Sequence, residues 1–147
     1  NFGAKSFVRL KETVAKSLLY ATVLALIVFL FIMVFPSQLA RVFTHDKLVL
    51  KEASSAVRIV FLITPLIAIQ LIGSAYFQAI GEAKKALFLT LTKQGFFLIP
   101  LILILPNYFG LLGVWISFPI ADFASTLITG LFLQTELKKY KVGAKLK

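Results

Sequence analysis

Four long apolar stretches limit what this sequence can fold into more than any other feature. The first, Leu18–Phe35, runs for 18 residues without a charged side chain. A helix of that length is about 27 Å long, close to the roughly 30 Å hydrocarbon core of a bilayer. The strands of a membrane β-barrel would instead alternate polar and apolar residues over about ten positions. We therefore predict an all-α integral membrane protein with four transmembrane helices, at about residues 11–36, 53–80, 84–106 and 109–137.

The positive charges indicate how these helices are oriented. The chain has 147 residues, with 16 Lys and Arg against 6 Asp and Glu, a net charge of +10. Twelve of the basic residues lie in the two terminal segments or near the connection between the second and third helices, and four lie between the first and second. Cytoplasmic segments are enriched in Lys and Arg, so both ends are predicted to be cytoplasmic in a multi-pass protein of the plasma (inner) membrane. Charges grouped between apolar runs do not form a basic face for nucleic acid, and no such partner is expected.

The residues needed for common catalytic and metal sites do not occur in recognisable patterns. There is no cysteine and a single histidine, His45, in a connection between helices. The sequence has no HExxH, P-loop or GxGxxG motif and no pair of carboxylates within the apolar stretches. We expect no catalytic residue, no metal ligand and no bound cofactor, and do not predict an enzyme.

Five polar residues inside the predicted helices are candidates for a substrate cavity: Gln70, Gln78, Lys93, Gln94 and Asp122. They belong to stripes with i, i+3, i+4 and i+7 spacing, one on each of the last three helices. Those helices are predicted to face a cavity or the protein interior. The first helix has no stripe and is predicted to face lipid. The stripes also suit helix packing, in which small and polar side chains let two helices approach each other.

Asp122 is the only acidic residue within the apolar stretches themselves, which cover Leu18–Phe35 and about residues 53–80, 86–105 and 111–133. It lies about 11 residues, or roughly 16 Å, into its helix and therefore near the middle of the bilayer. A charge there costs roughly 2.5–3.5 kcal/mol unless a partner or cavity accommodates it. Arg58 is the candidate partner, because Lys93 is predicted to lie at a different depth and to extend toward the cytoplasm.

Three prolines inside the predicted spans should bend their helices, because each removes a backbone hydrogen bond. They are Pro65, Pro100 and Pro119. Bent helices with polar stripes suit a transporter that moves around a central site, and they also suit a channel wall.

Several short segments, taken in order along the chain, resemble the multidrug and toxic compound extrusion (MATE) family of transporters. They are Asn1–Ala4 with Arg9, Phe43–Asp46, Phe77–Ala86, Lys93–Gln94 with Ile99–Pro100, Phe109–Trp115 and Pro119–Asp122. The resemblance covers essentially all of residues 1–147. It implies the C-terminal part of the second lobe of a two-lobe, twelve-helix protein, with the last four helices. Because the sequence begins inside one of these motifs, we expect a fragment of a longer chain.

The resemblance implies a secondary antiporter that exports cationic or amphipathic compounds in exchange for H⁺ or Na⁺ by alternating access. The implied partners are the remaining N-terminal part of the same transporter, the lipid bilayer and small-molecule drugs. Residues 66–70 contain no acid, and Lys93 stands where the family usually has Arg. The NorM-like branch of the family carries an acid in the stretch that matches residues 66–70, so its absence here resembles the DinF-like branch. That resemblance implies that the coupling acids lie in the other lobe. A related flippase of lipid-linked oligosaccharides and a small four-helix membrane scaffold subunit are the alternatives.

Overall fold

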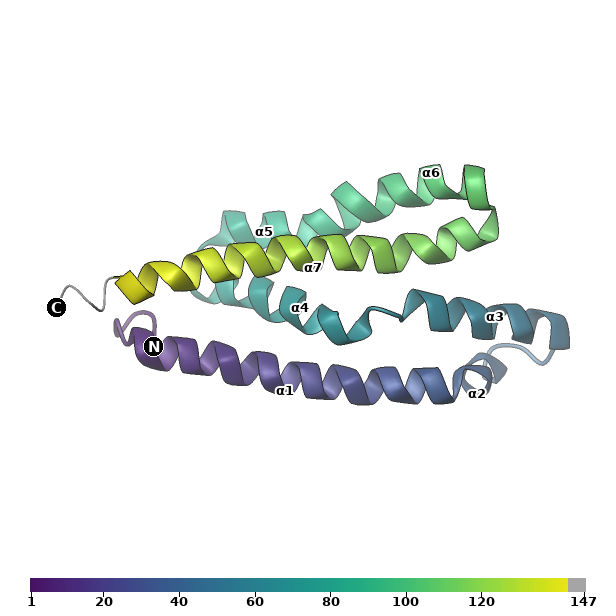
Figure 1. Ribbon diagram of the computed structural model, residues 1–147, viewed down its shortest axis with the longest axis horizontal. Coiled ribbons are helices and arrows are strands. Elements are labelled where there is room, and N and C mark those ends of the chain that lie inside the picture. Colours follow the sequence, from purple (N-terminus) through teal and green to yellow (C-terminus); the bar gives the residue numbers. More distant parts are fainter. Residues whose placement is uncertain (143–147) are drawn as a thin grey trace.

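The computed structural model describes residues 1–142 and is helical throughout, without a strand in that range. Its helices are α1 (Phe7–Val34), α2 (Pro36–Arg41), α3 (Lys47–Val60), α4 (Thr64–Ala79), α5 (Ala83–Leu91), the π-helix η1 (Thr92–Leu98), α6 (Ile99–Phe109) and α7 (Leu111–Val142). They form four rods that lie side by side along one long axis: α1, α3 with α4, α5 with η1 and α6, and α7 (Figure 1).

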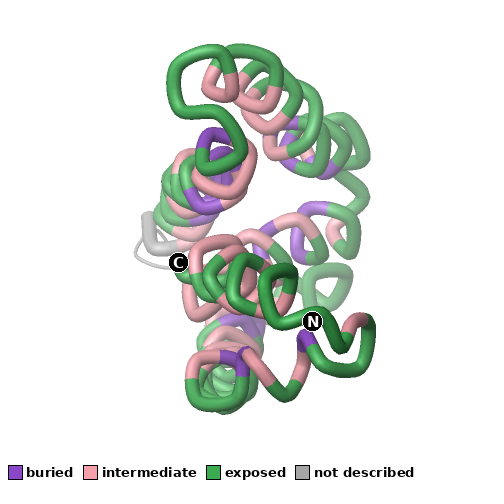
Figure 2. Tube along the Cα trace, turned by 90° about the vertical axis from the view of Figure 1, so that its right-hand side faces the viewer, coloured by how far each residue is buried: buried purple, intermediate pink, exposed green. Residues whose placement is uncertain are grey.

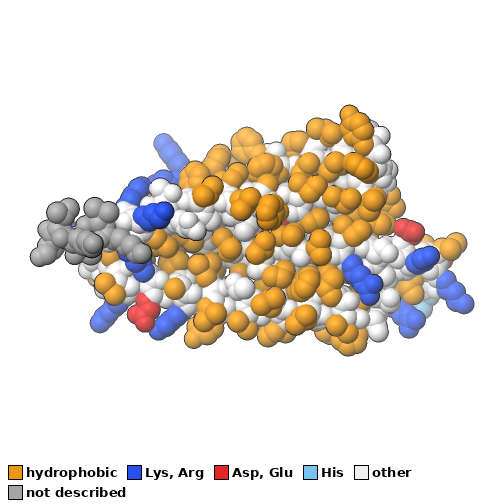
Figure 3. Space-filling view, viewed as in Figure 1, with side chains coloured by type: hydrophobic (Ala, Val, Ile, Leu, Met, Phe, Trp, Pro, Cys, Tyr) orange, Lys and Arg blue, Asp and Glu red, His pale blue; other side chains and the backbone are white. Residues whose placement is uncertain are grey.

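The rods have the length and composition of membrane spans. Three segments, Phe7–Val34, Ala83–Phe109 and Leu111–Tyr140, are long and apolar enough to cross a bilayer, and α3 with α4 makes a fourth if the bent pair is one span. Hydrophobic side chains cover the middle of the molecule, and Lys and Arg gather toward its two ends (Figure 3). The prediction of an all-α membrane protein is confirmed. We call the end at which α1 begins and α7 ends the basic end.

The second rod is broken, whereas the sequence predicted one helix over 53–80. α3 and α4 meet at an angle of 49° around residues 61–63. Pro65 explains the break, because its ring clashes with the carbonyl of Phe61 and has no N–H to donate to it. The Thr64 hydroxyl donates to that Phe61 carbonyl instead, at 2.7 Å. Helix α3 also begins six residues earlier than predicted, at Lys47. Its start is capped by Asp46, whose carboxylate accepts the Leu48 N–H at 2.8 Å.

The other two prolines affect their helices differently. Pro100 lies in the first turn of α6, directly after the π-helix η1. The third rod is therefore continuous at this proline, but its hydrogen-bond pattern changes from π to α just before it. The Ile99 N–H bonds the carbonyl of Gln94, five residues back, as in a π-helix. Pro119 is buried inside α7, which is continuous through it.

A one-residue turn joins the third and fourth rods at Gly110. Its φ of 56° lies in the left-handed region that favours glycine. Three residues later α7 passes so close to α6 that a Cβ on Gly113 would collide with the Leu105 carbonyl. These two glycines therefore fix the tight α6–α7 hairpin.

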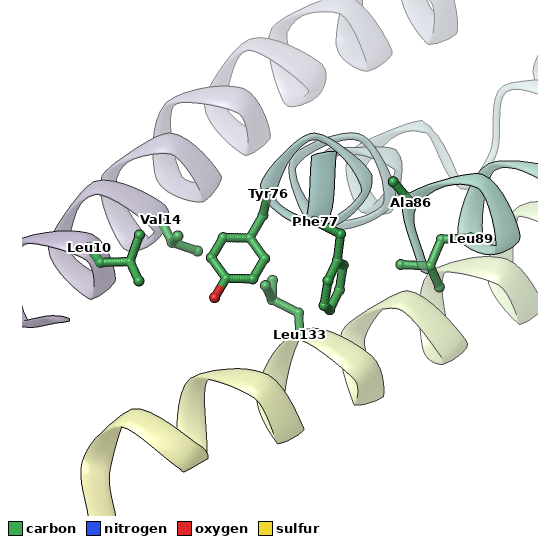
Figure 4. Close-up of a cluster of buried hydrophobic side chains, with 7 residues drawn as sticks. All are labelled: Leu10, Val14, Tyr76, Phe77, Ala86, Leu89 and Leu133. Atoms are coloured by element: carbon green, nitrogen blue, oxygen red, sulfur yellow. The ribbon is translucent and has the colours of Figure 1, made fainter. Parts of the chain in front are cut away.

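The best-packed part of the molecule lies toward the basic end. Side chains from all four rods meet there: Leu10, Val14, Tyr76, Phe77, Ala86, Leu89 and Leu133 (Figure 4). Elsewhere many residues on the outer sides of the helices are exposed (Figure 2). Helix α1 packs along α4, and its other side carries exposed Leu24, Ile27 and Leu30.

Candidate functional site

One face of α7 carries the polar stripe, and this face is buried. Asp122, Ser125, Thr126 and Thr129 are each at most 5% exposed as whole residues. Their spacing places them on one side of α7, which packs against α4 and η1. The hydroxyls of Ser125 and Thr129 donate to carbonyls of their own helix, at 3.1 and 2.9 Å. The stripe is thus a packing face in which two hydroxyls are satisfied within α7, whereas the buried Thr126 hydroxyl has no hydrogen-bond partner among the described residues.

Small and hydroxyl-bearing residues on α4 allow its neighbours to approach closely. A Cβ on Gly73 would collide with the methyl group of Thr129 on α7. The next residue, Ser74, shares a 2.9 Å hydrogen bond with the hydroxyl of Thr90 on α5. Helix α4 is therefore held between α5 and α7 by the contacts that small-residue stripes make in membrane proteins.

Asp122 forms an ion pair with Lys93, whose ammonium nitrogen lies 2.5 Å from one carboxylate oxygen. The Asp122 side chain is 6% exposed and that of Lys93 26%. Lys93 is the second residue of η1, and a π-helix turns its residues by a different angle from an α-helix. The pair thus joins α7 to the irregular part of the third rod in the interior of the membrane-spanning region.

This pairing corrects the expectation that Asp122 would pair with Arg58. Arg58 is exposed near the end of α3, and the expectation that Lys93 lies too far in depth from Asp122 to pair with it was wrong. Lys93 lies 16 residues from the Phe109 end of its rod, and Asp122 lies 11 residues from the Leu111 end of α7. The five-residue difference is about 7.5 Å along the axis, which the four-carbon stem of lysine largely spans.

The three glutamines lie apart from this pair. Gln70 is half-buried on α4, Gln78 is exposed near the end of α4, and Gln94 is exposed on η1. Within residues 1–142 their side chains form no hydrogen bond to protein, so of the five predicted cavity residues only Lys93 and Asp122 are joined by a direct contact. A role of all five in a substrate cavity stays a prediction.

A second polar group, which the sequence did not reveal, lies at the basic end around Glu136. Glu136 is 8% exposed. One of its carboxylate oxygens accepts from Lys85 at 3.2 Å and from Lys139 at 2.9 Å, and the other accepts from the Tyr140 hydroxyl at 3.2 Å. We call Glu136, Lys85, Lys139 and Tyr140 the Glu136 cluster. The i+3 and i+4 spacing within α7 was visible in the sequence, but the link to Lys85 was not.

The Glu136 cluster reaches all four rods through aromatic contacts. The Tyr140 ring stacks on Phe7 of α1, with ring centroids 4.8 Å apart. The Lys85 ammonium, on α5, lies 5.6 Å from the ring centroid of Phe77 on α4. A buried carboxylate with several donors can fix the relative positions of helices. Over the part of the chain that is described, no three or more His, Asp or Glu residues are placed to hold a metal ion.

Comparison with known proteins gives one family. The sequence model of the MatE family matches residues 1–104. A solved structure of the MATE multidrug transporter DinF-BH in complex with the dye rhodamine 6G is 45% identical, has a TM-score of 0.86 and is matched over 92% of this chain. No curated protein matches the sequence.

Two further solved structures show an outward-facing and an inward-facing conformation of a multidrug resistance MATE family transporter. Both are 27% identical over 95% of this chain, with TM-scores of 0.88 and 0.89 respectively. The chain spans only 30% of the DinF-BH chain and 32–33% of the other two.

Proposed function

This chain belongs to the MATE family of multidrug transporters, and from that membership we propose that it is part of a secondary antiporter. The complete transporter would export cationic or amphipathic compounds in exchange for H⁺ or Na⁺ by alternating access. The chain would supply the last four helices of the second lobe, and its partner would be the remaining N-terminal part of the same protein. The proposed setting is the plasma (inner) membrane, with both ends in the cytoplasm.

The observation that carries this proposal is the equal likeness to two opposite conformations. TM-scores of 0.88 to the outward-facing structure and 0.89 to the inward-facing one indicate that these four helices keep the same arrangement in both. In alternating access by rocking, one bundle moves against another as a nearly rigid body around a fixed site. A unit that fits both conformations equally well suits that role.

The Lys93–Asp122 pair supports a structural or substrate-orienting role for Asp122. A proton-coupling acid must exchange its proton with solvent during each cycle, whereas this carboxylate is 6% exposed and already paired with an ammonium group. We infer that Asp122 does not carry the coupled ion and that the coupling acids lie outside residues 1–147. Gln70, Gln78 and Gln94 would contribute polar contacts along the substrate path.

The proposal is tested in cells that express the complete transporter and lack other drug exporters. The probe is rhodamine 6G, the compound bound to DinF-BH. Cells with the transporter should accumulate less of the dye than cells without it, and the difference should vanish when the H⁺ and Na⁺ gradients are dissipated together. Equal accumulation with and without a normally inserted transporter would contradict the proposal. The similar solved structures described above are of multidrug transporters, so neither a flippase nor a scaffold is favoured.

A further inference from the structure

A groove on the outside of the molecule begins between two lysines at the basic end. A cavity of about 300 Å³ is lined by Lys11 of α1 and by Gln134, Leu137 and Lys138 of α7. The backbones of α1 and α7 make few close contacts, because both helices pack against α4. Side chains rather than backbone therefore enclose this space, and cationic and amide groups line part of it.

The groove continues away from the basic end along an apolar path. Gln134 also lines a second cavity, of about 250 Å³, between α4 and α7. Its other walls are Leu66, Ile69, Phe123, Thr126, Leu127, Gly130 and Leu131. Gly130 has no side chain to fill the space, and Leu131 and Leu127 are more than half exposed. The two cavities thus share a wall, with polar groups at one end and hydrocarbon along the rest.

The charges at the start of the groove lack protein partners. Three other lysines at the basic end, Lys16, Lys85 and Lys139, each pair with a glutamate. Within residues 1–142, neither Lys11 nor Lys138 forms an ion pair, and no acidic residue lines either cavity. Two ammonium groups and an amide are the donors that bind a phosphate, and basic pockets between helices at the cytoplasmic membrane surface bind anionic lipid headgroups.

The length of the groove fits one leaflet. From Lys138 to Phe123 is fifteen residues along α7, or about 22 Å. A bilayer with its headgroups is about 40–45 Å thick, so one leaflet with its headgroup layer is about as long as the groove. A bound lipid would place its phosphate between the lysines and one acyl chain beside Gly130.

We propose that this groove binds an anionic phospholipid of the leaflet at the basic end, with its headgroup on Lys11, Lys138 and Gln134. The inference requires that the helices span a bilayer and that the rest of the transporter leaves the groove open, and it does not depend on which compound is exported. An annular lipid with a fixed position would brace α1 against α7, which otherwise meet mainly through side chains.

The test measures lipid retention by the complete purified transporter, using native mass spectrometry. Phosphatidylglycerol and phosphatidylethanolamine with identical acyl chains are offered together. Wild type should retain phosphatidylglycerol preferentially. Replacing both lysines, Lys11→Gln with Lys138→Gln, should weaken that retention by roughly 30-fold, since each lysine near an anionic lipid is worth about fivefold. The control removes two exposed lysines of the same end that line no groove, Lys5→Gln with Lys84→Gln, and should leave the preference intact.

A second pair of variants tests the acyl part of the site. A Cβ on Gly130 would lie 3.8 Å from a methyl carbon of Ile69, an ordinary contact, so Gly130→Ala should be folded and bind lipid. Gly130→Leu should fill the groove and reduce retention of both lipids severalfold. Three results would overturn the proposal: no preference in wild type, equal loss in the control pair, or normal retention in Gly130→Leu. The first would mean that other helices of the transporter occupy the groove, and the second that the attraction is diffuse.

Discussion

At the scale of single residues, the Lys93–Asp122 pair decides whether the interior of the four-helix chain carries an uncompensated charge. The two side chains neutralise each other between η1 and α7, so a cationic compound that reached Asp122 would have to displace an ammonium group. The pair is therefore suited to holding two helices together and to orienting a substrate. A bare carboxylate would instead attract cations strongly in a region of low dielectric.

The strength of this pair can be measured with a double-mutant cycle. Asp122→Asn should destabilise the transporter, by less than the roughly 3–5 kcal/mol typical of a fully buried pair because Lys93 is partly exposed. Lys93→Gln should destabilise it as well, and the double variant should be more stable than the sum of the two single losses predicts. Thermal unfolding of the purified transporter gives the values. Strictly additive losses would show that the two residues are not coupled.

Substitution of Gly113 tests the close packing of α6 against α7. Gly113→Ala should lower the Tm of the transporter, because its Cβ would collide with the Leu105 backbone carbonyl and the α6–α7 hairpin would have to open. Overpacking of this kind costs about 1–3 kcal/mol. Gly95→Ala is the control, since its Cβ would have no neighbour within 4 Å. If both alanine variants melted at the same temperature, the close approach of α6 and α7 would be wrong.

At the scale of helices, irregular segments position the polar groups. The break before Pro65 bends the second rod by 49° between α3 and α4. The π-helix before Pro100 changes the directions in which the side chains around Lys93 point. Both follow from the donor that proline lacks, and both are confined to the middle of their rods. The ends of the rods are instead tied by side chains, most extensively in the Glu136 cluster.

The Glu136 cluster should contribute more to stability than an exposed ion pair of the same kind. Glu136→Gln removes the charge that two lysines and a tyrosine share in a site that is 8% exposed. Glu12→Gln removes the Glu12–Lys16 pair, in which both side chains are more than half exposed and which should be worth little. We expect a clear fall in Tm for the first variant and almost none for the second. Equal shifts would show that the cluster does not tie the rods together.

At the scale of the whole molecule, the orientation can be tested by single-cysteine labelling, because the chain has no native cysteine. Gln38→Cys and Asn107→Cys lie at the end opposite the basic end and should react with an impermeant maleimide added outside intact cells. Lys84→Cys, at the basic end, should react only after the cells are opened. Labelling of Lys84→Cys from outside would reverse the proposed orientation.

The sequence was most informative where structure depends on local patterns. The apolar stretches predicted the spans, and the regular spacing of polar residues predicted the stripe on α7. Contacts between distant segments were harder, because small errors in helix register decide which side chains meet. Counting residues along ideal helices placed Lys93 too far from Asp122, because the lysine stem was expected to extend toward the cytoplasm and it extends toward Asp122 instead. The bond between Lys85 and Glu136 joins residues 51 positions apart, and nothing local indicates it.

The most direct test of the proposed antiporter is transport by the purified, complete protein in proteoliposomes with imposed pH or Na⁺ gradients. The same rhodamine dye is the probe, and wild type is compared with Asp122→Asn. We expect wild type to move the dye against its gradient when H⁺ or Na⁺ flows the other way. We also expect Asp122→Asn to be slower but to respond to the same gradient. Wild-type protein that ignores both gradients would contradict the antiporter. Asp122→Asn protein that is folded and binds the dye but no longer responds would place the coupling site in this part of the transporter.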